Sequence, residues 1–183
     1  GVITGDTNVL IKDGSFTWVY GGGASGSVTG TANLTIEGGS FSDVYGGGNQ
    51  AAVGNANLIL RNGDFQWISG GGYDSGIDGN VEIHLKGGLY HQTVYTADSE
   101  QTAVGGSAAI YIYPGVEMDT GVSLTVGSYA ETALGVQYCY ESGQGNKQFP
   151  YQIGTPEELN FLRNFVGDAH KNTYFALSGD IDL

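Results

Sequence analysis

The sequence has few of the residues that stabilise or anchor a small domain by means other than packing. Cysteine occurs once in 183 residues, at Cys139, so no disulfide can form within the chain. Proline occurs only three times. No apolar run approaches the roughly 20 residues that a helix needs to cross a bilayer, so we expect no membrane insertion. The fold must therefore depend on side-chain packing and backbone hydrogen bonds.

Basic residues are also scarce. Lys and Arg together number 6 against 19 Asp and Glu, which gives a formal net charge of −13. A surface of this charge repels phosphate backbones and anionic lipids. Nucleic acids and membrane surfaces are therefore not expected partners.

Glycine, by contrast, is abundant, with 33 residues. No strict triplet period runs through these glycines, which excludes a collagen-like helix, and a hydrophobic content of 40% argues against disorder. A folded β protein that is rich in turns fits this composition best.

An internal repeat of about 25 residues covers most of the chain. Its clearest copies are NVLIKDGSFTWVYGGG from Asn8, NLTIEGGSFSDVYGGG from Asn33, NLILRNGDFQWISGGG from Asn57 and EIHLKGGLYHQTVYTA from Glu82. A degraded fifth copy, AIYIYPG, begins at Ala109, and VSLTV from Val122 is a candidate remnant of a sixth. The shared glycines of the five copies are Gly14, Gly39, Gly63, Gly88 and Gly115. A constant period of this length without helical patterning predicts a solenoid.

Each copy contains two clusters of apolar residues. In the first, apolar residues alternate with others, a period of two that predicts a strand. These pairs are Val9 and Ile11, Leu34 and Ile36, Leu58 and Leu60, Ile83 and Leu85, and Ile110 and Ile112. The second cluster predicts another strand and contains Phe16 and Val19, Phe41 and Val44, Phe65 and Ile68, and, after a slip of one residue, Tyr90 and Val94. We expect the glycine triplets at 21–23, 46–48 and 70–72 to supply positive φ values at the bends that follow.

The predicted fold is an all-β, right-handed parallel β-helix of about five or six coils. A β-sandwich also uses short strands at regular intervals. It would not require equivalent side chains to recur at one position of every repeat, whereas stacked coils do.

Residues 6 to about 127 resemble the glycine-rich right-handed parallel β-helix repeats of large secreted or wall-attached proteins of gut Firmicutes. The phrases that carry the resemblance are GGxF, as in GGSF from Gly38, and VYGGG, from Val19 and Val44. The resemblance implies an extracellular, cell-wall or cell-surface location in a bacterium, with neighbouring modules on the same polypeptide. It implies architecture and location rather than an activity.

Aromatic residues recur at two equivalent positions of the repeat. Trp18, Asp43, Trp67 and Gln92 share one predicted column, and Tyr20, Tyr45, Ser69 and Tyr95 share another. If the rings face solvent, they form a platform for sugar rings or for another protein. Packing under loops or against one another is the alternative. The candidate ligand-binding residues are Trp18, Asp43, Trp67, Tyr20 and Tyr45.

A third column is polar. Asn8, Asn33 and Asn57 occupy one position of the repeat, and stacked side-chain amides can hydrogen-bond along such a column. We interpret it as a structural ladder that ends at Glu82.

No catalytic residues are predicted. Polysaccharide-cleaving enzymes need carboxylates that converge on one face, and the positions equivalent to Asp13 and Asp64 carry no such acids in the other copies. The only metal candidate is a weak calcium site at Asp74 and Asp78, in a glycine-rich segment, and no other cofactor is expected.

The repeat gives way to a helical pattern near the C-terminal end of the sequence, which predicts two domains, residues 1–150 and 151–183. Thr155, Pro156 and Glu158 form the start signal of a helix over 156–166. Its apolar stripe is expected to cover the open end of the coil stack, unless this segment begins another module. The segment also resembles a phrase of bacterial surface proteins, I-x-T-x-E-E-L followed by an aromatic strand and D-I-D-L, here Ile153 to Leu159, Tyr174 to Leu177, and Asp180 to Leu183. The resemblance implies that the chain is part of a longer polypeptide.

Two functional classes follow from this sequence. We favour a structural or adhesive, non-catalytic module of a bacterial cell-surface or secreted protein, because the recurrent features all maintain the coil. The alternative is a carbohydrate-active module that binds a glycan, or less readily cleaves one, on the outer face of the helix. A glycan or a surface protein of host or bacterium is the expected partner.

Overall fold

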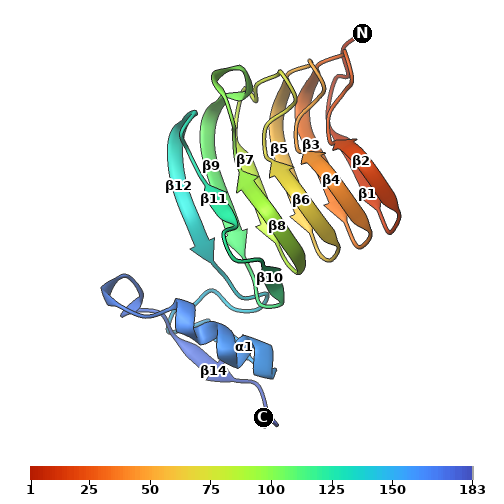
Figure 1. Ribbon diagram of the computed structural model, residues 1–183. Helices are drawn as coiled ribbons and strands as arrows, with labels where there is room; N and C mark the ends of the chain where they lie inside the picture. The colour runs from red at the N-terminus through yellow and green to blue at the C-terminus, as the bar shows by residue number, and fades with distance from the viewer. Residues whose placement is uncertain (183) are drawn as a thin grey trace. The chain divides into compact units, whose positions relative to one another are not determined.

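The computed structural model describes residues 1–182, and it confirms the predicted parallel β-helix (Figure 1). The chain divides into two compact units. The β-solenoid comprises residues 1–112 and 116–137, and a smaller unit comprises 113–115 and the chain from Tyr138 onward. The expected boundary between 150 and 151 falls inside the smaller unit. Within the described residues, no helix is long and apolar enough to span a membrane.

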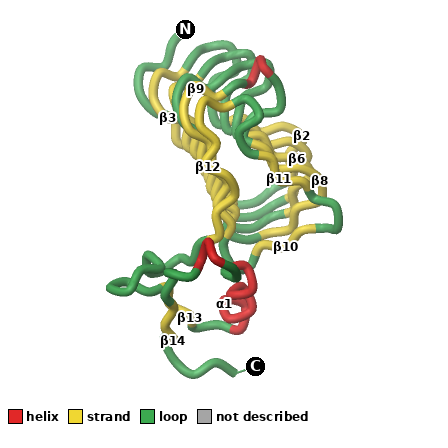
Figure 2. Tube along the Cα trace, turned by 90° about the vertical axis from the view of Figure 1, so that its left-hand side faces the viewer, coloured by secondary structure: helices red, strands yellow, loops and turns green. Residues whose placement is uncertain are grey.

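Two parallel sheets form the walls of the solenoid, and both are visible as stacks of strands in Figure 2. Sheet A contains, in order, β1 (Thr7–Ile11), β3 (Val28–Ile36), β5 (Val53–Leu60), β7 (Val81–Leu85), β9 (Val104–Ile112) and β12 (Ala130–Tyr138). Sheet B contains β2 (Ser15–Tyr20), β4 (Ser40–Tyr45), β6 (Asp64–Ser69), β8 (Gly88–Tyr95), β10 (Val116–Met118) and β11 (Ser123–Thr125). Each strand pairs with the equivalent strand of the next coil, which excludes the β-sandwich.

The stack amounts to about seven turns, more than the five or six expected. The segment VSLTV is not a sixth coil, because its strand β11 pairs with β8, as β10 does. A turn in which the Val122 N–H donates to the Asp119 carbonyl oxygen divides this strand of sheet B in two. The next turn is instead supplied by β12, whose sequence no longer resembles the repeat.

The predicted inward columns form the core of the solenoid. Val9, Leu34, Leu58, Ile83 and Ile110 pair in register along sheet A, and the last four side chains are fully buried. On sheet B the aromatic column stacks ring on ring. Its centroids are 5.6 Å apart for Phe16 and Phe41, 5.4 Å for Phe41 and Phe65, and 5.1 Å for Phe65 and Tyr90.

The glycines have different roles from those we expected. None of the triplet glycines has a positive φ; the shared glycines of the repeat do, for example +112° at Gly39 and +139° at Gly63. The triplets are instead required by close packing. A β-carbon at Gly46 would overlap the Gly70 carbonyl oxygen and the side chain of Leu58. The bend at each triplet therefore depends on the absence of a side chain, not on left-handed backbone.

In the smaller unit, β13 (Tyr151–Ile153) pairs in parallel with β14 (Phe175–Leu177). The helix α1 (Pro156–Phe161) begins with the predicted capping box, in which Thr155 Oγ1 accepts from the Glu158 N–H at 3.1 Å and the Glu158 carboxylate accepts from the Thr155 N–H at 3.2 Å. It is shorter than expected, because η2 (Leu162–Asn164) continues it as a 3₁₀ turn.

Aromatic rings form the interior of this unit. Tyr140 lies 5.4 Å from Phe161 and 5.5 Å from Phe165 between ring centroids, and its hydroxyl donates to the Glu158 carbonyl oxygen at 2.6 Å. Val166, the last residue of the expected apolar stripe, is 73% exposed. The stripe is therefore only partly packed within its own unit. The final residue of the D-I-D-L phrase, Leu183, lies outside the described residues, and the capping role of the segment stays a prediction.

Residues 1–182 also contain two further 3₁₀ turns, η1 (Glu100–Thr102) in the solenoid and η3 (Asp168–His170) in the smaller unit.

Candidate functional site

The predicted ligand-binding residues gather on the outer face of sheet B. Trp18 pairs in register with Asp43, and Asp43 with Trp67. Trp18 is 65% exposed and Trp67 is 41% exposed, whereas Asp43 between them is half-buried. We call the column Trp18, Asp43 and Trp67 the tryptophan column.

These side chains face outward because the strand alternation is interrupted. Phe41 and Val44 are both buried although they are three residues apart, so the two-residue alternation is broken between them. Asp43 and Tyr45, on either side of Val44, therefore lie on the outside. The repeat pattern groups Phe41 with Val44 but does not show where the alternation between them breaks, and strict alternation from Phe41 would place Asp43 inside.

One position of the predicted column is wrong. Trp67 pairs with Thr93 rather than with Gln92, because the register between β6 and β8 shifts after Phe65. The sequence predicted an extra residue between the buried Tyr90 and Val94. The same extra residue shifts the pairing of the outward-facing residues of β8.

Both tryptophan rings are held by neighbours. Trp18 hydrogen-bonds to the Asp43 carboxylate, which lowers the pKa of Asp43, but partial burial has the larger effect and the net shift of that pKa is upward. The ring of Trp67 meets that of Tyr95 edge to face, with 5.7 Å between centroids. The indoles are therefore oriented in advance of any binding event.

A tyrosine column runs beside the tryptophan column. Tyr20 and Tyr45 stack with centroids 5.1 Å apart and an interplanar angle of 12°, and the exposed Tyr73 meets Tyr45 edge to face at 5.9 Å. Desolvation, reinforced by the charge of Asp43, raises the pKa of Tyr45 to about 12. In the next coil Ser69 takes the tyrosine position, and its buried hydroxyl has no hydrogen-bond partner among the described residues.

A shallow depression of about 250 Å³ lies on the same face, next to the tryptophan column. Its polar lining consists of Ser15, Thr17, Ser40, Ser42, Asp64 and Gln66, over the rings of Phe16 and Phe41. Thr17, Ser42 and Gln66 directly precede the three members of the tryptophan column in the chain. Hydrogen-bonding groups and exposed aromatic rings are therefore side by side along the stack.

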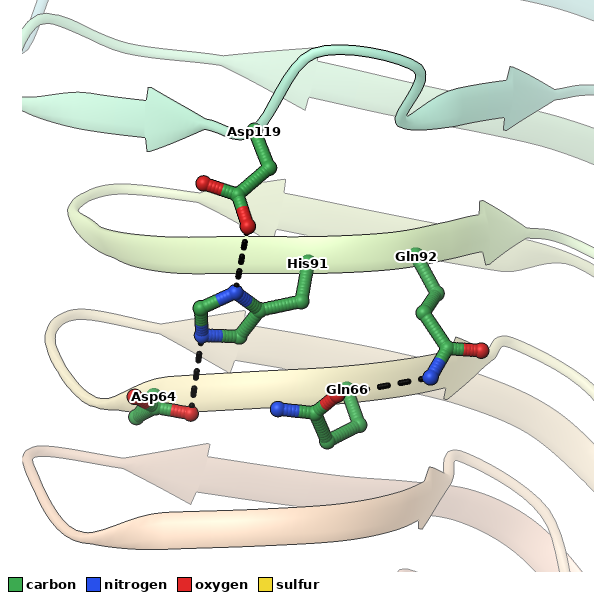
Figure 3. Close-up of polar contacts among 5 residues, drawn as sticks. All are labelled: Asp64, Gln66, His91, Gln92 and Asp119. Carbon is green, nitrogen blue, oxygen red and sulfur yellow. Dashed lines mark hydrogen bonds and ion pairs between the residues drawn. The ribbon is translucent and has the colours of Figure 1, made fainter.

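Residues of the next coils hold the polar lining of this depression in place (Figure 3). The Nδ1 of His91 lies 2.7 Å from Asp119 Oδ2, and its Nε2 lies 3.1 Å from Asp64 Oδ1. Gln92 donates to the side-chain oxygen of Gln66 at 3.3 Å. The hydrogen bonds that Asp119 and Asp64 accept raise the pKa of His91, Asp119 having the larger effect, and the imidazolium form can donate to both carboxylates at once.

The sequence analysis missed this bridge. His91 belongs to no metal-binding or catalytic motif, and its partners lie 27 residues before it and 28 residues after it. The repeat did contain a signal, since Phe65 pairs with Tyr90 and Met118 pairs with Tyr90 on the other side. The residues that follow Tyr90 and Met118, His91 and Asp119, are therefore placed on adjacent coils. Because each ring nitrogen of His91 faces a carboxylate, the bridge is suited to positioning Asp64 rather than to exchanging protons with a ligand.

The calcium candidates lie elsewhere, in the loop between β6 and β7. Asp74 and Asp78 are both exposed, and Asp74 has a positive φ of 49°. Over residues 1–182, no three His, Cys, Asp or Glu side chains are grouped so that they could hold a metal ion. Asp98 of the next coil is engaged by the hydroxyls of Thr102 at 2.7 Å and Tyr95 at 3.2 Å. Calcium binding here stays a prediction that the geometry of the loop does not strengthen.

Sheet A has a second depression, of about 390 Å³, lined mainly by asparagines. The predicted ladder is present there. Asn57 Nδ2 donates to Asn33 Oδ1 at 3.3 Å, and Asn33 Nδ2 donates to the Thr7 carbonyl oxygen at 3.3 Å. Asn80 Oδ1 accepts from the Ser107 N–H at 2.9 Å. These amides are largely occupied in joining one coil to the next.

Comparison of the chain with protein-family models, with curated proteins and with solved structures finds no match.

Proposed function

We propose that this chain is a non-catalytic adhesive module of a secreted or surface-attached bacterial protein, and that it binds an extended glycan on the outer face of sheet B. One observation carries the proposal. Two tryptophans that a solenoid of this kind does not need for its core lie exposed in one register column, at 65% and 41% of their accessible surface. Large exposed apolar side chains grouped on one face are characteristic of binding surfaces.

The spacing of the rings suits a linear polymer. Trp18 and Trp67 are two coils apart, and doubling the strand separation places them about 9 to 10 Å from each other along the stack. Non-adjacent sugar rings of an extended chain can then lie against the two indoles. The hydroxyls of Ser15, Ser40 and Ser42 in the neighbouring depression supply hydrogen bonds to the sugar hydroxyls.

The solenoid also lowers the conformational cost of binding. The ladder of backbone hydrogen bonds holds the strands, Asp43 orients Trp18, and Tyr95 supports Trp67. A surface that is ordered before the ligand arrives loses less side-chain entropy on association. A rigid stalk with a binding face along its side is what an adhesive module requires.

Screening the purified chain on a glycan array, with and without calcium, tests this proposal. We expect the wild type to retain one class of linear glycan. Trp18→Ala and Trp67→Ala should each lose about tenfold in affinity, because each removes the buried area of an indole together with about 0.5 to 1.5 kcal/mol of aromatic stacking. Tyr129→Ala, which removes a 38% exposed ring outside the two columns, is the matched control. The proposal is wrong if no glycan is retained, or if both tryptophan variants bind like the wild type.

A further inference from the structure

Lys and Arg side chains lie away from the proposed binding face, and the basic side chain nearest to it, His91, is held between Asp64 and Asp119. The solenoid contains three Lys and Arg residues, Lys12, Arg61 and Lys86, and each lies in the turn that precedes a strand of sheet B. The tryptophan column lies toward the other end of those strands. Arg61 and Trp67 are six residues apart, which corresponds to about 20 Å of extended chain.

Acidic groups, in contrast, lie among the rings. Asp43 is between the two tryptophans in the register, and Asp64 lines the adjacent depression. The charge of Asp43 is also felt by Tyr20 and Tyr45, which places this carboxylate beside both aromatic columns. The face thus combines exposed π systems with two carboxylates. Asp64 already faces the Nε2 of His91 at 3.1 Å, whereas Asp43 is approached by the indole of Trp18 and is the carboxylate open to a cationic ligand.

We infer that the glycan bound on this face carries free amino groups, and that a sugar ammonium is held against Asp43 between the rings of Trp18 and Trp67. The inference rests on the proposed function and adds the chemical class of the ligand. Ammonium groups are attracted to the faces of aromatic rings, most strongly to tryptophan, and a carboxylate at the same place adds a charge-assisted hydrogen bond.

The same arrangement works against anionic polymers. A uronic acid or a sulfated sugar at this position would place its negative charge near Asp43, on a chain whose formal net charge is already −13. Neutral sugars would keep the stacking and hydroxyl contacts but gain nothing from the carboxylate. We therefore expect the affinity of this face to be highest for amino sugars, lower for neutral sugars and lowest for acidic sugars.

Titration calorimetry with two matched oligosaccharides tests the inference. The probes are a β-1,4-linked glucosamine hexamer and its fully N-acetylated counterpart, at a pH at which the sugar amines are protonated. We expect the wild type to bind the amine form about tenfold more tightly. In Asp43→Asn, which keeps the shape of the side chain, that preference should vanish while binding of the acetylated hexamer stays the same.

Glu37→Gln is the control for general charge. Glu37 is an exposed acid of the same coil, located in the turn between β3 and β4, away from the tryptophan column. It should keep the full preference, and thermal melts of both variants verify that they are folded. If Glu37→Gln and Asp43→Asn weaken the preference equally, the attraction is a property of the net charge and the inference is wrong.

The outcomes separate this inference from the proposed function. Binding of the acetylated hexamer as tightly as the amine form, with loss in Trp18→Ala, overturns the amino-sugar inference and leaves glycan binding standing. Absence of binding for both hexamers contradicts the inference alone if the array has identified another glycan. If the array is also blank, both the inference and the proposed function fail.

Discussion

The outer faces of the two sheets use the same stacked geometry in different ways. On sheet A the recurring polar side chains bond to one another, as Asn57 does to Asn33. On sheet B the two tryptophans do not stack on each other, because Asp43 separates them in the register. Neighbouring equivalents that satisfy each other stabilise the solenoid. The two tryptophans instead remain exposed and do not pack on each other, which suits them to the proposed ligand.

Substitutions in the core and on the two outer faces are therefore expected to change different measured properties. Substitutions in the core of sheet B and at the glycine triplets should change the free energy of unfolding. Substitutions on the outer face of sheet A should change it slightly. Substitutions in the tryptophan column should change binding and leave stability nearly constant.

The largest effect is expected from Phe41→Ala. Phe41 is 2% exposed and its ring stacks between those of Phe16 and Phe65, so its loss leaves a cavity that neither neighbour can fill. We expect the free energy of unfolding to fall by about 3 to 5 kcal/mol, measured by chemical denaturation. Phe16→Ala, in the same column but 40% exposed, should cost clearly less. If Phe41→Ala and Phe16→Ala lowered the free energy of unfolding equally, burial would not determine how much each ring stabilises the solenoid.

Gly46→Ala is expected to destabilise the solenoid by about 1 to 3 kcal/mol, as overpacking does. The added methyl group has to displace both the Gly70 carbonyl oxygen and the Leu58 side chain, and the first is held by the backbone. The midpoint of thermal unfolding measures the effect. Gly135 separates clash from backbone strain: its β-carbon would meet nothing within 4 Å but its φ is +80°, so Gly135→Ala reports the strain alone. A stable Gly46→Ala variant would mean that the coils can move apart at the triplets.

A paired experiment compares the two outer faces directly. Asn33→Ala removes a rung of the amide ladder and should lower the free energy of unfolding by about 1 kcal/mol, while glycan binding remains. Trp18→Ala should change stability by no more than about 0.5 kcal/mol, because the side chain is mostly in solvent, and should weaken binding. The assignment of roles fails if the two variants show the reverse pattern.

The smallest expected effect is a pH dependence from His91. Asp119 and Asp64 raise its pKa, so the imidazolium is favoured by folding. The stabilisation is fully present below the unfolded pKa of about 6.5 and is lost as the pH rises through the folded value. His91→Gln should therefore lower the unfolding midpoint at acidic pH and converge on the wild type at alkaline pH. An NMR titration of the His91 ring should give a pKa above that of a histidine in an unfolded peptide; a lower value would contradict the bridge.

Some features of the candidate site could be predicted because the repeat itself encodes them. The shared column of Trp18, Asp43 and Trp67 follows from counting, since stacked coils bring residues 24 or 25 positions apart into register. The start of the helix at Thr155 could also be predicted, because a capping box involves only four consecutive residues. The end of the helix could not be predicted in this way, since the residues after Phe161 adopt the tighter 3₁₀ geometry.

Other features depended on where small irregularities occur. Whether the tryptophan column faces solvent was decided by the interrupted alternation between Phe41 and Val44. The bridge from Asp64 through His91 to Asp119 depended on side-chain contacts across three coils, and the partner of Trp67 depended on the shifted register of β8. A single extra residue reverses the face on which every later side chain lies, and no propensity of that residue signals it.

The sequence by itself determined that the chain forms a parallel solenoid, which residues share a column, and which of those columns are apolar. These properties follow from period and composition, because equivalent residues of successive coils must stack at the strand separation. Only the tertiary structure decided which columns face outward, that the glycine triplets serve close packing rather than left-handed turns, and that His91 connects three coils. Those outcomes depend on register shifts and on backbone approach between segments about 25 residues apart, which no local pattern in the chain specifies.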